Sequence, residues 1–193
     1  MSVLAALEEL AIAVLIVIAL RLVVPLAILR WPLAGGILAL LVDAFDVVLV
    51  DAIAYAIGQP SEFGPFYAQT DKYFDTYYLS LELVVVRHWP ESLPRRAATY
   101  LFLWRLAGVV AFEITGQRPL LLVFPNLFEN FYLYVLIVRR WVPALMPRTI
   151  AQVVAVVVVL LVPKLIQEWI LHVEQAHPWL WFRQHFIEPV LGL

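Results

Sequence analysis

The chain has 193 residues, of which 64% are hydrophobic and only 15% are charged, and its mean hydropathy is +0.89. This composition lies far outside that of soluble globular domains and indicates a protein with several helices in a lipid bilayer. The formal net charge of −2 and the lack of a basic surface argue against a nucleic-acid partner. Because cysteine is absent, disulfides, thiolate metal sites and iron–sulfur clusters are excluded.

Six apolar stretches are long enough to cross a membrane, because a hydrocarbon core of about 30 Å needs about 20 residues of α-helix. We predict an all-α, polytopic bundle that forms one transmembrane domain over residues 1–193. Its spans are expected at residues 10–29, 33–57, 68–86, 97–114, 119–138 and 149–171. Glu8 and Glu9 stand where a signal peptide would carry basic residues, so the first stretch is expected to be a retained span. Residues 178–193 mix aromatic and polar side chains and are expected at the membrane interface.

The short loops alternate in their content of basic residues. The first, third and fifth loops carry Arg30, Arg87, Arg95, Arg96, Arg139, Arg140 and Arg148. The second loop has no basic residue and the fourth has only Arg118. Because short cytoplasmic loops are enriched in Lys and Arg, we expect the odd loops in the cytoplasm and both termini on the non-cytoplasmic side.

Acidic residues inside the second and third predicted spans are the strongest functional signal. An ionisable group in a bilayer costs roughly 2.5 to 3.5 kcal/mol, so these side chains must face a polar interior. Asp43 and Asp46 are neighbours on one face of the second helix, since they are three residues apart. Four residues at spacings of 4, 3 and 4 share one face of the third helix: Asp71, Asp75, Tyr78 and Glu82.

The remaining spans add polar residues that can face the same interior. The fourth span carries Arg105 near its middle, which we expect to pair with Asp46 or Glu129. The fifth and sixth spans contribute Asn126, Glu129, Asn130, Lys164 and Glu168. With Arg21 assigned to the membrane surface, which its long side chain can reach, the spans hold nine acids against three bases. Carboxylates without a base must take up a proton or hold a cation.

These patterns predict a protein that binds or transports a cation, a proton or a cationic small solute through an outward-facing acidic cavity. Asp46, Asp71 and Asp75 are the expected metal ligands or proton carriers. Carboxylate oxygens favour a divalent or alkali cation. Haem is not expected, because the four histidines lie at or beyond the ends of the spans. In a first alternative the chain is a structural subunit, and the polar face of the third helix holds the bundle together or binds a partner. The small size of the chain favours a homo-oligomer or a larger membrane complex.

A second alternative comes from a resemblance. The motif Asp43-x-x-Asp46, followed by Ser-Glu-Phe-Gly at 61–64 and Asp71-x-x-x-Asp75, resembles the CDP-alcohol phosphotransferases over residues 43–75. In that family, aspartates from two successive helices bind metal ions that position a CDP-linked lipid on the cytoplasmic side. The resemblance implies a metal-dependent lipid enzyme. The sequence departs from the family pattern, because Val47 replaces a glycine, the following Ala-Arg pair is missing and the spacing to the second aspartate pair differs.

Overall fold

The computed structural model describes residues 12–58, 67–117, 119–172 and 183–191. Within these ranges the chain is helical between short turns and contains no strand, which confirms the all-α prediction. Two of the described helices are long and apolar enough to cross a membrane, Ile12–Leu29 and Ser92–Thr115. A bent pair formed by residues 32–57 raises that number to three.

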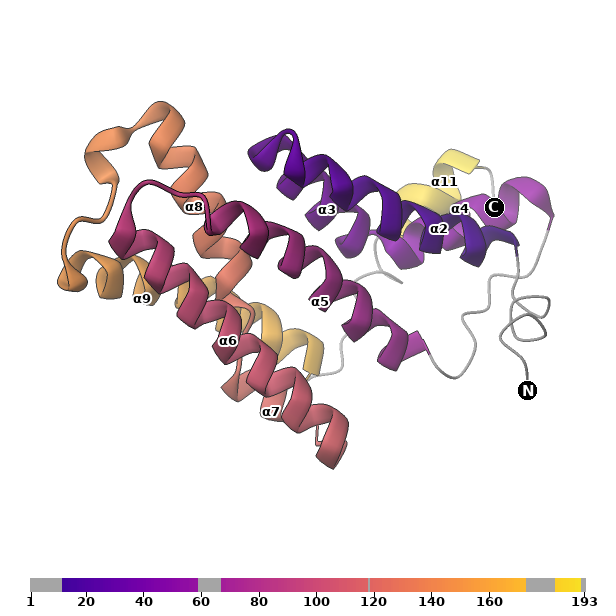
Figure 1. Ribbon diagram of the computed structural model, residues 1–193. Coiled ribbons are helices and arrows are strands. Elements are labelled where there is room, and N and C mark those ends of the chain that lie inside the picture. The colour runs from indigo at the N-terminus through magenta and orange to yellow at the C-terminus, as the bar shows by residue number, and fades with distance from the viewer. Residues whose placement is uncertain (1–11, 59–66, 118, 173–182, 192–193) are drawn as a thin grey trace.

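The helices pack as a bundle in which η1, α3, α5, α6 and α8 surround the larger apolar core, and α2 lies beside α4 (Figure 1). In chain order the elements are α2 (Ile12–Val23), η1 (Val24–Leu29), α3 (Pro32–Ala44), α4 (Asp46–Ile57), α5 (Tyr67–Val86), α6 (Ser92–Thr115), α7 (Pro119–Val123), α8 (Leu127–Trp141), η2 (Pro143–Leu145), α9 (Ile150–His172), η3 (Arg183–Ile187) and α11 (Glu188–Leu191). The bounds of α5 and α9 agree to within a residue with two of the predicted helices, whereas α6 begins five residues earlier than predicted.

The connection between η1 and α3 is a tight hairpin. Pro25 lies at the start of η1, and Pro32 is the first residue of α3, where its missing N–H costs no hydrogen bond. A Cβ atom at Gly35 would lie 2.4 Å from the backbone nitrogen of Ile28. Only glycine therefore permits this approach of the two elements, which keeps α2 and η1 beside α3.

The second predicted span, residues 33–57, is not one straight helix. It breaks at Phe45, and the axes of α3 and α4 differ in direction by 67°. No proline or glycine lies at the break. The carboxylate of Asp46 instead accepts the N–H of Val47 at 2.6 Å, which gives the first turn of α4 a partner for one of its free N–H groups. The break leaves Asp43 and Asp46 on either side of the bend.

The fifth predicted span, residues 119–138, is also broken. Pro125 has no N–H, so the helix cannot continue through it, and α7 ends at Val123. α8 starts anew after Asn126, whose side-chain oxygen accepts the N–H of Glu129 at 3.5 Å as an N-cap. The prediction of one continuous helix was wrong here, because the proline ends the helix instead of kinking it.

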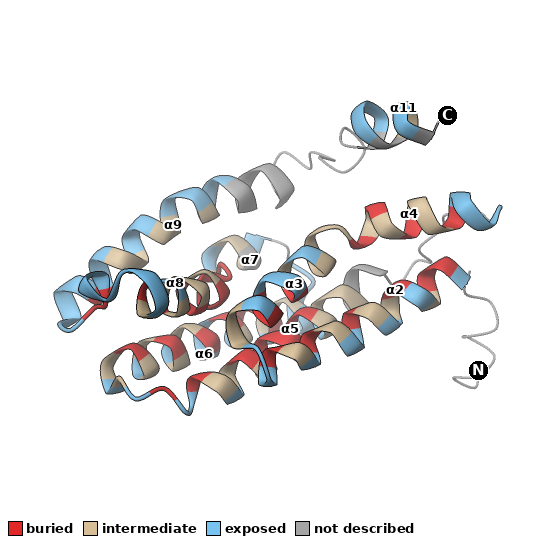
Figure 2. Cartoon of the chain, turned by 90° about the horizontal axis from the view of Figure 1, so that it is seen from above, coloured by how far each residue is buried: buried red, intermediate tan, exposed pale blue. Residues whose placement is uncertain are grey.

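Aromatic side chains from α6 and α8, with Trp89 from the turn before α6, build the larger core. Trp89 stacks on Tyr132 with ring centroids 5.9 Å apart, and Phe102 meets Phe128 edge to face at 5.3 Å. Figure 2 shows the buried residues gathered where α3, α5, α6 and α8 meet, whereas the described part of α9 is largely exposed. A smaller apolar cluster joins α2 to α4.

Candidate functional site

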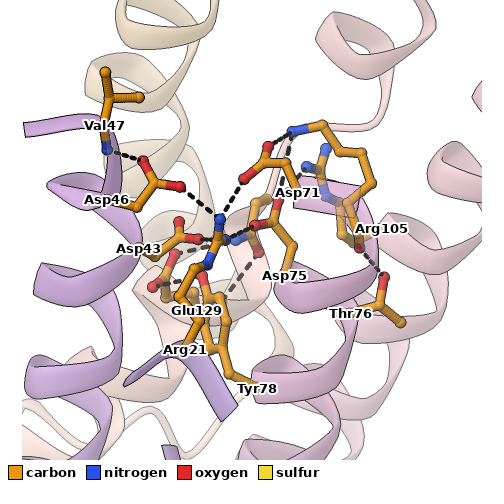
Figure 3. Close-up of polar contacts among 12 residues, drawn as sticks. Arg21, Asp43, Asp46, Val47, Asp71, Asp75, Thr76, Tyr78, Arg105 and Glu129 are labelled. Carbon is orange, nitrogen blue, oxygen red and sulfur yellow. Dashed lines mark hydrogen bonds and ion pairs between the residues drawn. The ribbon is translucent and has the colours of Figure 1, made fainter. Parts of the chain in front are cut away.

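Four aspartates converge on one guanidinium, that of Arg21 on α2 (Figure 3). Its Nη1 donates to Asp46 at 2.6 Å and to Asp71 at 2.8 Å. Its Nη2 donates to Asp43 and, at 3.2 Å, to Asp75. The Arg21 side chain is only 4% exposed and also lies over the ring of Phe74. We call Arg21 and these four aspartates the Arg21 cluster.

The sequence analysis missed Arg21 as a site residue. A basic residue late in an apolar stretch is typical of a side chain that reaches out to the membrane surface. The signal that could have found it is Arg30, which ends the same stretch nine positions later and leaves Arg21 well inside it. The structure places Asp43 and Asp46 beside Asp71 and Asp75.

Two further bases border the Arg21 cluster. Lys72 donates to Asp71 at 2.8 Å and lies 3.5 Å from Asp75. Arg105 on α6 lies 3.8 Å from Asp75 and donates to the carbonyl of Phe124 at 3.1 Å. That carbonyl belongs to the break between α7 and α8. The expected partners of Arg105 were Asp46 or Glu129, and the described ion pair is with Asp75 instead.

A second polar group lies between α5 and α8. The hydroxyl of Tyr78 donates to Glu129 at 2.9 Å, and the amide of Asn126 donates to the other oxygen of Glu129 at 3.0 Å. All three side chains are buried. We call them the Glu129 group. Lys164 on α9 is close enough to act electrostatically on Glu129, so this predicted site residue lies near the group.

Glu82 is fully buried, and neither of its oxygens has a hydrogen-bond partner among the described residues. One oxygen would lie 3.3 Å from a Cβ atom placed at Gly36, so this glycine leaves room for the carboxyl. Tyr132 also lies beside Gly36, and its hydroxyl donates to the carbonyl of Pro32. An ionised carboxylate held in this way would cost several kcal/mol.

The structure brings together most of the predicted site residues. The four aspartates and Arg105 meet at the Arg21 cluster, while Tyr78, Asn126 and Glu129 meet beside it (Figure 3). Asn130 is half-buried on α8, and no contact of its side chain joins it to either group in the part of the chain that the structure describes. The side chain of Glu168 lies outside the described residues.

The charges of this region do not balance. Six carboxyls belong to it, namely Asp43, Asp46, Asp71, Asp75, Glu82 and Glu129. Four bases face them: Arg21, Lys72, Arg105 and Lys164. The excess of acids is smaller than the sequence count of nine against three, because Arg21 adds one base and because Asp51, Glu113 and Glu168 are not among these six carboxyls. Two negative charges still have no basic counterpart among the described residues.

Three of the aspartates could hold a metal ion by their spacing. Asp43, Asp71 and Asp75 each offer a carboxylate oxygen, and these oxygens lie within 4.8 Å of one another. However, at least five of the six oxygens of these carboxylates have a basic nitrogen as ion-pair partner. A metal ion would have to displace Arg21 or Lys72 from them. Asp46, the third metal ligand expected from the sequence, is not part of this triad.

Comparisons of the chain with protein families, with characterised proteins and with solved structures found no match.

Proposed function

We propose that this chain is a polytopic membrane protein that binds and moves protons or small cations through the Arg21 cluster and the Glu129 group. The observation that carries the proposal is the excess of two carboxyls over bases among the described residues of this largely buried region. Buried acids in excess are stable only when protons or cations neutralise them. The site must therefore take up positive charge whenever the protein is folded.

A proton is the cation that this arrangement accepts with the least rearrangement. Five oxygens of the Asp43, Asp71 and Asp75 carboxylates are already bonded to basic groups, so a metal ion finds few free ligands. Among the described residues, in contrast, neither oxygen of Glu82 has a hydrogen-bond partner, and the side chain is fully buried. A single proton on Glu82 removes its charge and needs no additional ligand.

The acidic residues of α5 follow one another along one face of the helix and are suited to pass protons along it. From Asp71 to Glu82 the helix advances 11 residues, which corresponds to about 16 Å or roughly half of a bilayer core. Asp75 and Tyr78 lie between these two ends, and the hydroxyl of Tyr78 connects this face of α5 to Glu129. A hydroxyl can accept one proton while it donates another, so Tyr78 is suited to pass a proton between the Arg21 cluster and the Glu129 group.

In this proposal six helical segments lie in the membrane, formed by α2 with η1, α3 with α4, α5, α6, α7 with α8, and α9. The broken segments fit this placement, because irregular backbone is tolerated at membrane depth only where protein surrounds it. At the second break, Asn126 is buried and Arg105 binds the carbonyl of Phe124. The proposed path opens toward the non-cytoplasmic side, on which both termini lie.

The test is a flux assay on protein reconstituted in liposomes with a pH-sensitive dye trapped inside. Wild-type protein should dissipate an imposed proton gradient when a counter-ion can cross the membrane. Glu82→Gln and Glu129→Gln, which keep size but cannot change charge, should slow this flux at least about tenfold. Glu113→Gln is the matched control, because Glu113 is an exposed acid on α6 outside both groups. No flux of protons, Na⁺, K⁺ or Mg²⁺ above that of empty liposomes would refute the transport proposal.

The geometry of Asp43, Asp71 and Asp75 supports a second candidate function, that of a metal-dependent enzyme that acts on a lipid. Its support is the convergence of oxygens from α3 and α5 within 4.8 Å. In this case Mg²⁺ or Mn²⁺ should raise the melting temperature of the wild-type protein, and Asp71→Asn with Asp75→Asn should abolish the rise. The same metals should be required for turnover of a CDP-linked alcohol and a lipid acceptor. A wild-type melting temperature independent of divalent metals would eliminate this candidate.

A further inference from the structure

A cavity of about 350 Å³ lies far from the acidic site, beyond the C-terminal end of α5. Its walls come from the start of α6 and from the chain between α8 and α9, and the connections α5–α6 and α8–α9 lie at the same end of the bundle (Figure 1). The residues that matter for its chemistry are Glu91, Ser92, Pro94, Arg139, Pro147 and Arg148. We call it the α6/α8 pocket. Its volume is within the usual range of small-ligand sites.

The charge of the pocket is positive. Arg139 forms an ion pair with Glu91 through two nitrogens, which neutralises the one acid in the lining. The exposed guanidinium of Arg148 has no carboxylate partner in the described part of the chain. The N–H groups of Ser92 and Leu93 precede the first backbone bond of α6, from Arg95 to the carbonyl of Glu91. Free N–H groups at the start of a long helix add partial positive charge.

The pocket is held rigidly. Arg139 lies over the ring of Trp89 at 5.1 Å, so its guanidinium is fixed on two sides. Prolines 94, 143 and 147 lie in the walls and limit the backbone motion of both connections. Tyr134 donates to the carbonyl of Leu145 at 2.7 Å and anchors η2 to α8. A preformed basic pocket loses little entropy when an anion binds.

The surface beside the pocket is apolar. Trp141, Val142 and Leu145 are between 45% and 62% exposed, although they belong to the short segment that also supplies Pro143. Exposed tryptophan and aliphatic side chains next to arginines are typical of the level where lipid headgroups meet acyl chains. This neighbourhood favours a lipid over a soluble anion as the source of the negative charge.

We propose that the α6/α8 pocket binds the phosphate group of an anionic phospholipid. Arg148 and the α6 N-terminus face the phosphate oxygens, Arg139 holds the pocket open through Glu91 and Trp89, and the acyl chains lie along Trp141 and Leu145. The site rests on the membrane location proposed above but is independent of the acidic path, because the two regions share no residue.

The experiment measures thermal unfolding of the full chain in detergent micelles that contain either phosphatidylglycerol or phosphatidylcholine. Phosphatidylglycerol should raise the melting temperature of the wild type in a saturable manner. Arg148→Gln should weaken the apparent affinity about tenfold or more, as expected for the loss of one charge-assisted hydrogen bond. Arg140→Gln is the control, since Arg140 is exposed, adjacent to Arg139 and outside the pocket lining.

Each outcome decides the proposal. A shift that needs phosphatidylglycerol, weakens in Arg148→Gln and survives in Arg140→Gln supports the lipid site. The same shifts in melting temperature with inorganic phosphate alone, measured against chloride at equal ionic strength, would assign the pocket to a soluble phosphate compound. That result would overturn the proposal of a lipid ligand. Equal loss of apparent affinity in both variants, or no shift in the melting temperature of the wild type, would overturn the proposed binding site. A Glu82→Gln variant that retains the shift separates this result from failure of the proton path.

Discussion

Arg21 explains how four aspartates can share one buried place. Each aspartate has the same guanidinium as partner, and the distances to Asp46 and Asp71 are below 3 Å. Arginine suits this role because its planar fork presents five N–H donors and stays charged at any physiological pH. Lysine would offer one point charge and could lose its proton. The sequence-based analysis found the acids because charge in an apolar stretch is conspicuous, and it missed Arg21 because arginine near a span end is ordinary.

Arg21→Gln should destabilise the protein by about 3 to 5 kcal/mol, the usual effect of leaving buried charges without their partner. Neutralising an acid as well, in Arg21→Gln with Asp46→Asn, should recover part of this loss. The measurement is a double-mutant cycle of unfolding free energies in detergent. Arg30→Gln, at an exposed position in the turn before α3, is the matched control and should change stability by less than about 0.5 kcal/mol. A coupling energy below about 0.5 kcal/mol would contradict the shared role of Arg21.

Tyr78→Phe tests the hydroxyl that connects α5 to α8. The change removes the donor to Glu129 and leaves a buried oxygen without it, which should cost about 1 to 3 kcal/mol of stability. In the liposome assay the same variant should slow proton flux. Tyr73→Phe removes a hydroxyl from a side chain of the same helix that is 60% exposed, and it should leave both readings unchanged. Equal stability of the two variants would show that the Tyr78 hydroxyl does not matter.

The two broken elements show which features of a sequence determine where a helix is interrupted. The break after α7 is predictable from Pro125, because proline has no N–H to donate and the helix cannot continue through it. The break at Phe45 has no such residue. It depends on the side chain of Asp46 bonding the N–H of Val47 and on Arg21 drawing both flanking aspartates, and these are contacts between distant parts of the chain. Composition and periodicity therefore predicted helices in these two regions, but not that one is bent and the other interrupted.

Gly→Ala variants at three helical positions distinguish the effect of close packing on stability from the effect of helix propensity. Gly35→Ala would place a Cβ 2.4 Å from backbone of η1, and Gly108→Ala would place one 2.2 Å from Phe124. Each should destabilise the protein by about 1 to 3 kcal/mol or more, because the neighbouring elements must move apart. Gly36→Ala meets only side-chain atoms at 3.0 Å and beyond, and the gain in helix propensity offsets much of that cost. Gly36→Ala should therefore melt at a higher temperature than the other two variants. A Gly36→Ala variant as unstable as the other two would show that the side chains around Gly36 cannot move to make room for the Cβ.

At the scale of the molecule, the two proposed sites lie at different ends of the bundle. The Arg21 cluster is near the start of α5, and the α6/α8 pocket lies beyond its end. The described part of α9 exposes much of its apolar surface, including Ile150, Val159 and Val162, each more than half exposed. Lipid covers such a surface in the proposed arrangement, as would a second copy of the chain in a homo-oligomer.

Orientation is testable because the chain contains no cysteine that would react in the background. Gln117→Cys lies in the connection between α6 and α7, and Ala144→Cys lies in η2; both positions are exposed. With the odd loops in the cytoplasm, an impermeant thiol reagent added to intact cells should label Gln117→Cys and spare Ala144→Cys. After the membrane is permeabilised, both should react. The reverse pattern would place the α6/α8 pocket on the outside and favour an enzyme that works at the cytoplasmic face.

The dependence of Arg21 on distant acids has a consequence for how the protein is made. Arg21 is synthesised 22 residues before Asp43 and 50 residues before Asp71. At the usual 5 to 20 residues per second, the second interval lasts about 3 to 10 seconds. When Asp43 and Asp46 have been made, Asp71 and Asp75 do not yet exist, so Arg21 at first has only two of its four final partners. In the proposed membrane arrangement, α2 therefore takes up its final position only after α5 has been made, because α5 supplies the other two.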